Sequence, residues 1–192
     1  MPAEHALLGL LAMSEGGASH GYVLAQSFMD GQPLGDVLRL EPGMLYHHLK
    51  KLERHGWIES STEAQANRPS RRTYRLNEAG RAELERWFAE PVTHTREIRL
   101  EFLVKLHFVR MLDPEQLPRL IREQREVLER LAASQERLLA GVEADSDFRR
   151  AVIDLRLAQT KAAIAWLDRA ARILPVGSST DPAQRGERQP GR

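Results

Sequence analysis

Residues 43–54 carry side chains suited to binding a polyanion. Placed on a helix at about 100° per residue, the three leucines of this segment share one side and are expected in the core. The opposite side and its flanks carry Gly43, Met44, Tyr46, His47, Lys50, Lys51 and Arg54. Cations, a His that can donate or accept and a flanking Tyr suit contacts in the DNA major groove. The alternative is a solvated face, because any amphipathic helix turns polar residues outward.

The segment NRPSRRTYR, residues 67–75, carries four arginines and no acid. Residues 57–61 and 72–76 alternate like two strands and predict a β-hairpin around the intervening polar loop. A hairpin that projects arginines beside a recognition helix can reach phosphates or an adjacent minor groove. A charge run is also compatible with a solvated surface. Because this one follows the cationic helix in the order of a helix-turn-helix frame, we favour DNA binding.

The charge distribution agrees with this interpretation, although the net charge of the whole chain is only +1. Residues 39–75 contain eight cations and four carboxylates, a net +4. Residues 113–145 contain five arginines and eight acids, a net −3. The two halves of the chain therefore have different electrostatic roles.

The seven histidines give little support to metal or catalytic chemistry. His47 and His48 are adjacent and diverge on a helix, and neither HxxxH nor HExxH occurs. The sequence lacks a Gly-rich phosphate loop and contains no cysteine, which excludes disulfides and thiolate ligands. The sequence contains no run of about 18 apolar residues, so no membrane span is predicted. We therefore expect that the protein is not an enzyme and binds no metal, cofactor or membrane. We also expect a cytoplasmic location.

The order of predicted elements defines the fold class. Helices at residues 3–14, 20–29 and 42–55, the hairpin, and a helix from Asn77 to about Glu90 predict a winged helix-turn-helix. Beyond Pro91 the pattern is helical, with helices at 96–112, 117–142 and 148–174. The expected fold is mainly α. We expect a DNA-binding domain at 1–92, a helical dimerisation domain at 93–174 and a disordered tail at 175–192.

Self-association is expected from the last predicted helix, whose apolar arc is too wide for one neighbouring helix to cover. A coiled-coil spacing also runs through residues 117–142. The residues assigned to dimerisation are Phe102, Leu106, Leu128, Leu131, Val152, Leu155, Ile164 and Leu167. Trp87 and Trp166 are explained by packing, or by the stacking of a small aromatic effector.

The chain resembles the PadR family of bacterial transcriptional regulators. The resemblance lies in HGYVLAQSF at 20–28, PGMLYHHLKKLERHGWI at 42–58 and RPSRRTYRLNEAGRAEL at 68–84, followed by long helices. The resemblance implies a homodimeric, DNA-binding repressor whose C-terminal helices exchange contacts across a two-fold axis. Counting the helix face above, the residues expected to bind DNA are His20, Gly21, Tyr22, Pro42, Gly43, Met44, Tyr46, His47, Lys50, Lys51, Arg54, Arg68, Arg71 and Arg72.

These observations predict a sequence-specific, effector-responsive transcriptional repressor that binds a pseudo-palindromic double-stranded operator as a homodimer. The alternative is an adaptor that uses its winged helix to bind proteins and does not read DNA sequence. The +4 segment favours DNA, since phosphates dominate the affinity of DNA-binding surfaces.

Overall fold

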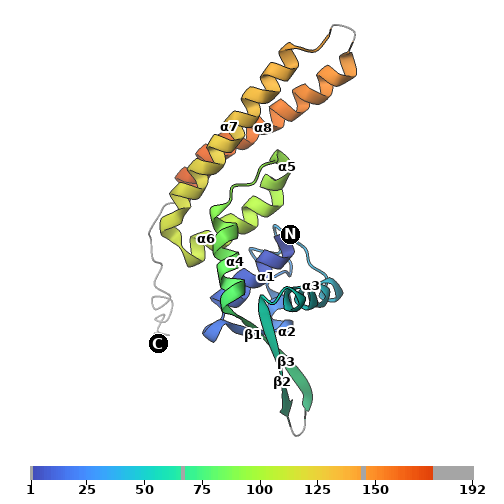
Figure 1. Ribbon diagram of the computed structural model, residues 1–192, viewed down its shortest axis with the longest axis vertical. Helices are drawn as coiled ribbons and strands as arrows, with labels where there is room; N and C mark the ends of the chain where they lie inside the picture. Colours follow the sequence, from blue (N-terminus) through green and yellow to red (C-terminus); the bar gives the residue numbers. More distant parts are fainter. Residues whose placement is uncertain (1, 66–67, 144–145, 175–192) are drawn as a thin grey trace, which may run out of the picture.

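The structure is a computed structural model that describes residues 2–65, 68–143 and 146–174 (Figure 1). Between residues 63 and 71 it describes no side chains. The predicted disordered tail, residues 175–192, lies outside the described residues. Along the chain the elements are α1 (Pro2–Met13), β1 (Ala18–His20), α2 (Gly21–Gln26), α3 (Pro42–Arg54), β2 (Ile58–Gln65), β3 (Arg68–Leu76), α4 (Glu78–Ala89), α5 (Thr95–Glu97), a π-helical turn (Ile98–Phe102), α6 (Leu103–Leu112), α7 (Leu117–Ala140) and α8 (Asp147–Ile173). The predicted fold class, a winged helix-turn-helix followed by long helices, is confirmed.

Local sequence signals set the ends of α3 and the start of α4. Pro42 occupies the first turn of α3, where its missing N–H costs no hydrogen bond. Gly56 follows the helix with a φ of 70°, a left-handed conformation that glycine adopts without strain. Asn77 caps α4, since its side-chain oxygen accepts a hydrogen bond of 2.9 Å from the backbone N–H of Gly80. Pro42, Gly56 and Asn77 thus fix the positions of α3, the hairpin and α4 along the chain.

The sheet has three antiparallel strands in the order β1-β3-β2. The sequence did not predict β1, because its three residues are too few to show an alternating pattern. Ser19 of β1 pairs with Tyr74 of β3, and His20 pairs with Thr73. Since α2 begins directly after His20, this pairing attaches the start of α2 to the root of the hairpin.

The hairpin is longer than the two predicted strands, 57–61 and 72–76. The ladder between β2 and β3 continues to the pair Gln65 and Arg68, with an irregularity between Glu63 and Gln65. The residues of this outer part are mostly polar in sequence and show no apolar alternation, so the sequence pattern could not predict these strand ends. In Figure 1 the hairpin projects from one end of the molecule, and the α7–α8 hairpin extends from the other.

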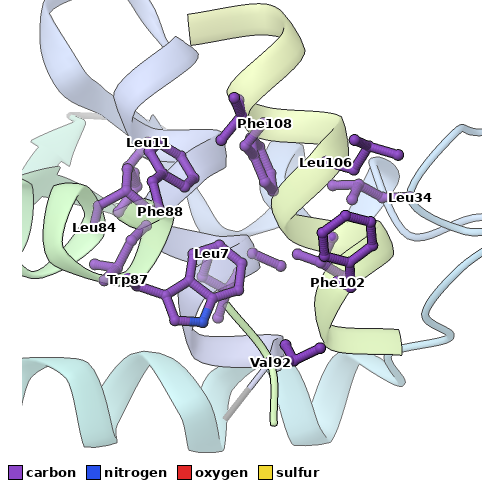
Figure 2. Close-up of a cluster of buried hydrophobic side chains, with 14 of the residues drawn as sticks. Leu7, Leu11, Leu34, Leu84, Trp87, Phe88, Val92, Phe102, Leu106 and Phe108 are labelled. Carbon is purple, nitrogen blue, oxygen red and sulfur yellow. The ribbon is translucent and has the colours of Figure 1, made fainter. Parts of the chain in front are cut away.

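Helix α1 is buried along most of its length because other elements cover it on several sides. It contacts α3, α4, α6 and β3. Its leucines pack beside Trp87 and Phe88 of α4 and Phe108 of α6 (Figure 2). A Cβ added at Gly9 would lie 2.6 Å from the ring of Phe108. Helices α1 and α6 therefore approach so closely that position 9 has no room for a side chain. Helix α1 therefore joins the winged helix to the C-terminal helices through one core.

The C-terminal helices differ in detail from the prediction. The helix expected at 96–112 is divided into α5, the π-helical turn and α6. The coiled-coil spacing predicted for 117–142 is used within the chain, where α7 packs along α8 (Figure 1). Both helices are antiparallel neighbours joined near residues 141–146, and they bury a shared seam that includes Leu128 and Leu167.

Candidate nucleic-acid interface

The outward face of α3 is exposed as the sequence predicts. Leu45, Leu49 and Leu52 are fully buried. Met44, Tyr46, His47, Lys50 and Arg54 are exposed, with Tyr46 at 45%. Pro42 and Gly43, at the start of the helix, are also exposed. This half of the helix surface is available to a partner.

The exposed face of α3 and the root of the hairpin line one open groove. Its lining comprises His47, Lys50, Glu53 and Arg54 from α3 and Arg72 from β3. Three permanent cations and one carboxylate therefore converge from two elements. Such a groove attracts phosphate groups, and the helix beside it can meet base edges. The side chains of Arg68 and Arg71, also predicted to bind DNA, lie outside the described residues.

Tyr46 is held by the start of α2. A Cβ added at Gly21 would lie 2.7 Å from Cε1 of Tyr46, so only glycine allows the ring this position. Gly21 itself is buried, which assigns it to positioning Tyr46. The neighbouring Tyr22 is exposed, and Nδ1 of His20 lies 3.1 Å from Oγ1 of Thr73 on β3. Of the predicted trio, Gly21 thus packs against α3 and His20 contacts the hairpin, while Tyr22 faces outward.

Lys51 and His48 turn toward α1. Lys51 Nζ lies 2.7 Å from Oε1 of Glu4, and His48 Nδ1 lies 3.2 Å from the same oxygen. Burial opposes the ionised form of Glu4, but the hydrogen bonds from Lys51 and His48 outweigh it and hold the pKa of that carboxyl below its ordinary value. This geometry favours a structural role for Lys51 over the DNA contact that the helix projection predicts.

Comparison with known proteins identifies the family. Residues 7–86 match the family described as "Transcriptional regulator PadR-like family", and residues 98–175 match "Virulence activator alpha C-term". The chain belongs to the PadR-like family of transcriptional regulators. This family is not enzymatic, so the expectation that the chain is not an enzyme is confirmed.

Residues Gly17–Gly21 have the Gly-x-Ser-x-Gly spacing of hydrolases, but Ser19 lies in β1, paired with Tyr74, instead of at a strained turn.

Two curated relatives show how far the similarity extends. The negative transcriptional regulator PadR of Bacillus subtilis is 28% identical over 176 residues, 86% of this chain and 93% of that protein. A probable transcriptional regulator of Mycobacterium tuberculosis is 35% identical over 96 residues, 50% of this chain and 48% of that protein. The crystal structure of Bacillus subtilis PadR in complex with operator DNA is 22% identical, with a TM-score of 0.44, and covers 90% of this chain and 98% of that one.

The PadR-like regulator has a pocket of about 640 Å³ between the segment that follows α4 and helix α8. Its lining is Thr95, Arg96, Ile98, Arg99, Leu103, Gln159, Ala162, Ala163 and Trp166. Trp166 meets Phe102 edge-on, with ring centroids 6.2 Å apart. Of the two predicted effector residues, Trp166 therefore borders a cavity. The sequence could not predict the arginines of this pocket, because α5 and α8 meet only in the tertiary structure.

Trp87, the other predicted effector residue, is covered by the regulator's own side chains. Its ring stacks on His5 with centroids 4.5 Å apart, and Lys105 Nζ lies 4.9 Å from its centroid. Its Nε1 donates a hydrogen bond of 2.9 Å to Oε1 of Glu101. Since Trp87 is only 3% exposed, the interpretation of this residue as a stacking surface for a ligand is corrected.

The predicted dimer residues divide into two groups. Phe102, Leu106, Leu128 and Leu167 are buried within the chain itself and offer no surface to a second copy, so their assignment to a dimer interface is corrected. Leu131, Val152, Leu155 and Ile164 remain at least partly exposed. The helix projection could not separate the groups, because α7 and the 95–103 segment cover the faces of α8 selectively.

Neither a metal site nor a membrane span is found in the parts of the chain that the structure describes. Residues 2–65, 68–143 and 146–174 contain no group of three or more His, Asp or Glu arranged to hold a metal ion. Within the same ranges no helix combines the length and the apolar character needed to cross a bilayer.

Proposed function

We propose that this PadR-like regulator is a cytoplasmic, homodimeric repressor that binds a pseudo-palindromic double-stranded operator. The N-terminal domain, residues 1–92, reads the DNA, and residues 93–174 pair two copies. The observation that supports this most directly is the groove in which Lys50 and Arg54 of α3 lie beside Arg72 of the hairpin. Repression agrees with the name of the Bacillus subtilis relative, a negative regulator.

The division of roles on the DNA-binding face follows from side-chain chemistry. Lys50 and Arg54 neutralise phosphates, which supplies most of the affinity and makes it dependent on salt. Met44, Tyr46 and His47 lie at the N-terminal half of α3, the part of a recognition helix that meets base edges in the major groove. We therefore assign affinity to the cations and sequence preference to the other three residues.

Pairing of two copies is supported by the apolar residues that α8 leaves uncovered. Phe148, Leu155 and Ile173 are 83%, 58% and 72% exposed, which is costly for an isolated helix hairpin in water. They belong to a four-and-three spacing along α8 that also includes Val152 and Trp166. A second copy packed along this line removes that surface from water and presents two α3 helices to successive major grooves about 34 Å apart.

A small aromatic effector is proposed for the pocket beside Trp166. The apolar lining and the indole suit an aromatic ring, and Arg96 and Arg99 supply positive charge at its edge. The Bacillus subtilis relative has been solved in complex with p-coumaric acid. For this chain the proposal rests on the lining of its own pocket. Because that pocket borders α8, an occupant would change the dimer geometry and release the operator.

The proposed function is tested by measuring how the protein binds the DNA upstream of its own gene. Fluorescence anisotropy at several salt concentrations gives the affinity. The logarithm of the affinity is expected to fall steeply with the logarithm of the salt concentration, and Lys50→Ala is expected to reduce that slope by about one unit. Selection of bound sequences from random DNA is expected to yield two inverted half-sites. A flat salt response, or equal binding to all sequences, would support the protein-binding adaptor instead.

The effector pocket is tested separately with p-coumaric acid as the probe. Its addition is expected to quench Trp166 fluorescence in a Trp57→Phe, Trp87→Phe background and to weaken operator binding. Ala162→Phe, which fills part of the pocket and adds no second indole, is expected to weaken both effects while the operator still binds. Unchanged fluorescence and unchanged operator affinity at saturating probe would reject this ligand class for the pocket.

A further inference from the structure

Glu53 is a carboxylate in a groove that otherwise carries cations. It lies on α3 between Lys50 and Arg54, and its side chain is 22% exposed. A carboxylate on a surface that meets DNA repels phosphates, so its presence on this face calls for a compensating role. The contacts that Glu53 makes indicate what that role is.

One oxygen of Glu53 joins the recognition helix to both strands of the hairpin. Glu53 Oε1 accepts hydrogen bonds of 2.5 Å from Oγ of Ser60 on β2 and of 2.7 Å from Nη2 of Arg72 on β3. Arg72 Nε in turn donates to Ser60 Oγ at 2.9 Å. The guanidinium carbon lies 5.5 Å from the ring centroid of Tyr74, a buried residue of β3. Glu53, Ser60 and Arg72 therefore form a closed triangle, which we call the wing brace.

We propose that Glu53 is a positioning residue that fixes the hairpin against the recognition helix, and that Arg72 acts through this wing brace and not as a phosphate contact. The inference rests on the proposed DNA binding. A two-stranded ribbon is only marginally rigid by itself, and the brace attaches it to α3 near its root. Charge-assisted hydrogen bonds are stronger than those between neutral groups. The planar guanidinium of Arg72 can bridge two acceptors, here Glu53 Oε1 and Ser60 Oγ.

The brace and the phosphate-contact alternative predict opposite effects of the same substitution. If Arg72 contacts a phosphate, Glu53→Gln frees that guanidinium and removes a repulsive charge, so DNA binds more tightly. If Glu53 holds the hairpin in place, Glu53→Gln loosens it and DNA binds more weakly, although the face has become more positive. The sign of the change therefore separates the two roles.

The experiment measures operator affinity at several salt concentrations for the full-length chain. We expect Glu53→Gln to weaken binding about tenfold, the loss expected for one charge-assisted hydrogen bond, with the salt slope unchanged. Ser60→Ala, which changes no charge, is expected to weaken binding a few-fold. Glu59→Gln is the matched control, because it removes an exposed β2 carboxylate outside the brace. It is expected to leave affinity unchanged or slightly higher.

A double-mutant cycle and a measurement without DNA complete the test. Glu53→Gln is expected to weaken binding only while Arg72 is present, so Arg72→Ala removes its effect. Hydrogen exchange of the β2 and β3 amides is expected to accelerate in Glu53→Gln and not in Glu59→Gln. Tighter binding by Glu53→Gln, or a salt slope reduced by about one unit in Arg72→Ala, would overturn the brace. If the unmodified chain shows no steep salt response, the proposed function fails, and hydrogen exchange still decides the brace.

Discussion

Gln124 of α7 hydrogen-bonds both backbone groups of Val92, the residue that links α4 to the C-terminal helices. Its Oε1 accepts from the Val92 N–H at 2.8 Å, and its Nε2 donates to the Val92 carbonyl at 2.9 Å. Gln124 is fully buried. In the sequence Gln124 only interrupts an apolar coiled-coil spacing. In the structure it joins α7 to the segment after α4 by satisfying both the N–H and the C=O of Val92.

Replacement of Gln124 is therefore expected to destabilise the fold strongly. Gln124→Leu preserves most of the volume but leaves a buried N–H and a buried C=O without partners, at a cost of about 2–5 kcal/mol in the free energy of unfolding. Urea denaturation measures this. Leu139→Ala, at a half-buried position on the same helix, is the comparison for ordinary truncation. A change below about 0.5 kcal/mol for Gln124→Leu would show that the linker does not depend on this pairing.

Gly21→Ala is expected to lower DNA affinity through Tyr46. The added methyl group would lie 2.7 Å from the Tyr46 ring, so the ring must move, at a cost of about 1–3 kcal/mol in stability. Gly141→Ala is the control, because its methyl group meets no atom closer than 3.7 Å and the residue follows α7, outside the predicted DNA-binding face. Thermal unfolding and operator binding of both variants test this, and equal behaviour would contradict it.

Lys105 is expected to make stability depend on pH above neutrality. Burial lowers its pKa from 10.5 to about 8, and it donates a hydrogen bond to the backbone carbonyl of Glu90 beside the Trp87 ring. Below pH 8 both the folded and the unfolded chain hold the proton, so the full cost of burying the charge is present. Between about 8 and 10.5 only the unfolded chain keeps the proton, so the free energy of unfolding rises with pH, by at most about 3 kcal/mol.

The measurement for Lys105 is urea denaturation of the unmodified chain and of Lys105→Met from pH 7 to pH 10. The difference between the two removes the contributions of other titrating groups. The unmodified chain is expected to gain stability relative to Lys105→Met as the pH rises through 8. A difference that stays constant across this range would show that Lys105 does not titrate there.

Two substitutions on α8 are expected to separate pairing from folding. Leu155 is 58% exposed, so Leu155→Asp should leave the helical circular dichroism intact and shift sedimentation toward the monomer. Leu167 is fully buried, so Leu167→Asp places a carboxylate in the core and should unfold the C-terminal helices. A chain that sediments as a folded monomer before any substitution would refute the proposed homodimer.

How much could be predicted from the sequence depends on how local the cause was. Pro42, Gly56 and Asn77 act within one turn of their own helices, so the boundaries of α3 and α4 followed from residue type alone. The same holds for the outward face of α3, because the 3.6-residue period places Tyr46, His47 and Lys50 opposite the leucines whatever surrounds the helix.

The tertiary structure decided which groups meet across the fold. Arg72 and Glu53 are 19 residues apart and form one brace, and Trp87 is enclosed while Trp166 borders a pocket. The short strand β1 exists because β3 supplies its hydrogen-bond partners. An amphipathic pattern states that a face must be covered, but not whether the cover is α7, α6 or a second copy, since burial depends on every neighbour at once. For that reason the sequence could predict the outward face of α3, and only the packed chain showed that Lys51 turns to Glu4 while Lys50 and Arg54 stay exposed.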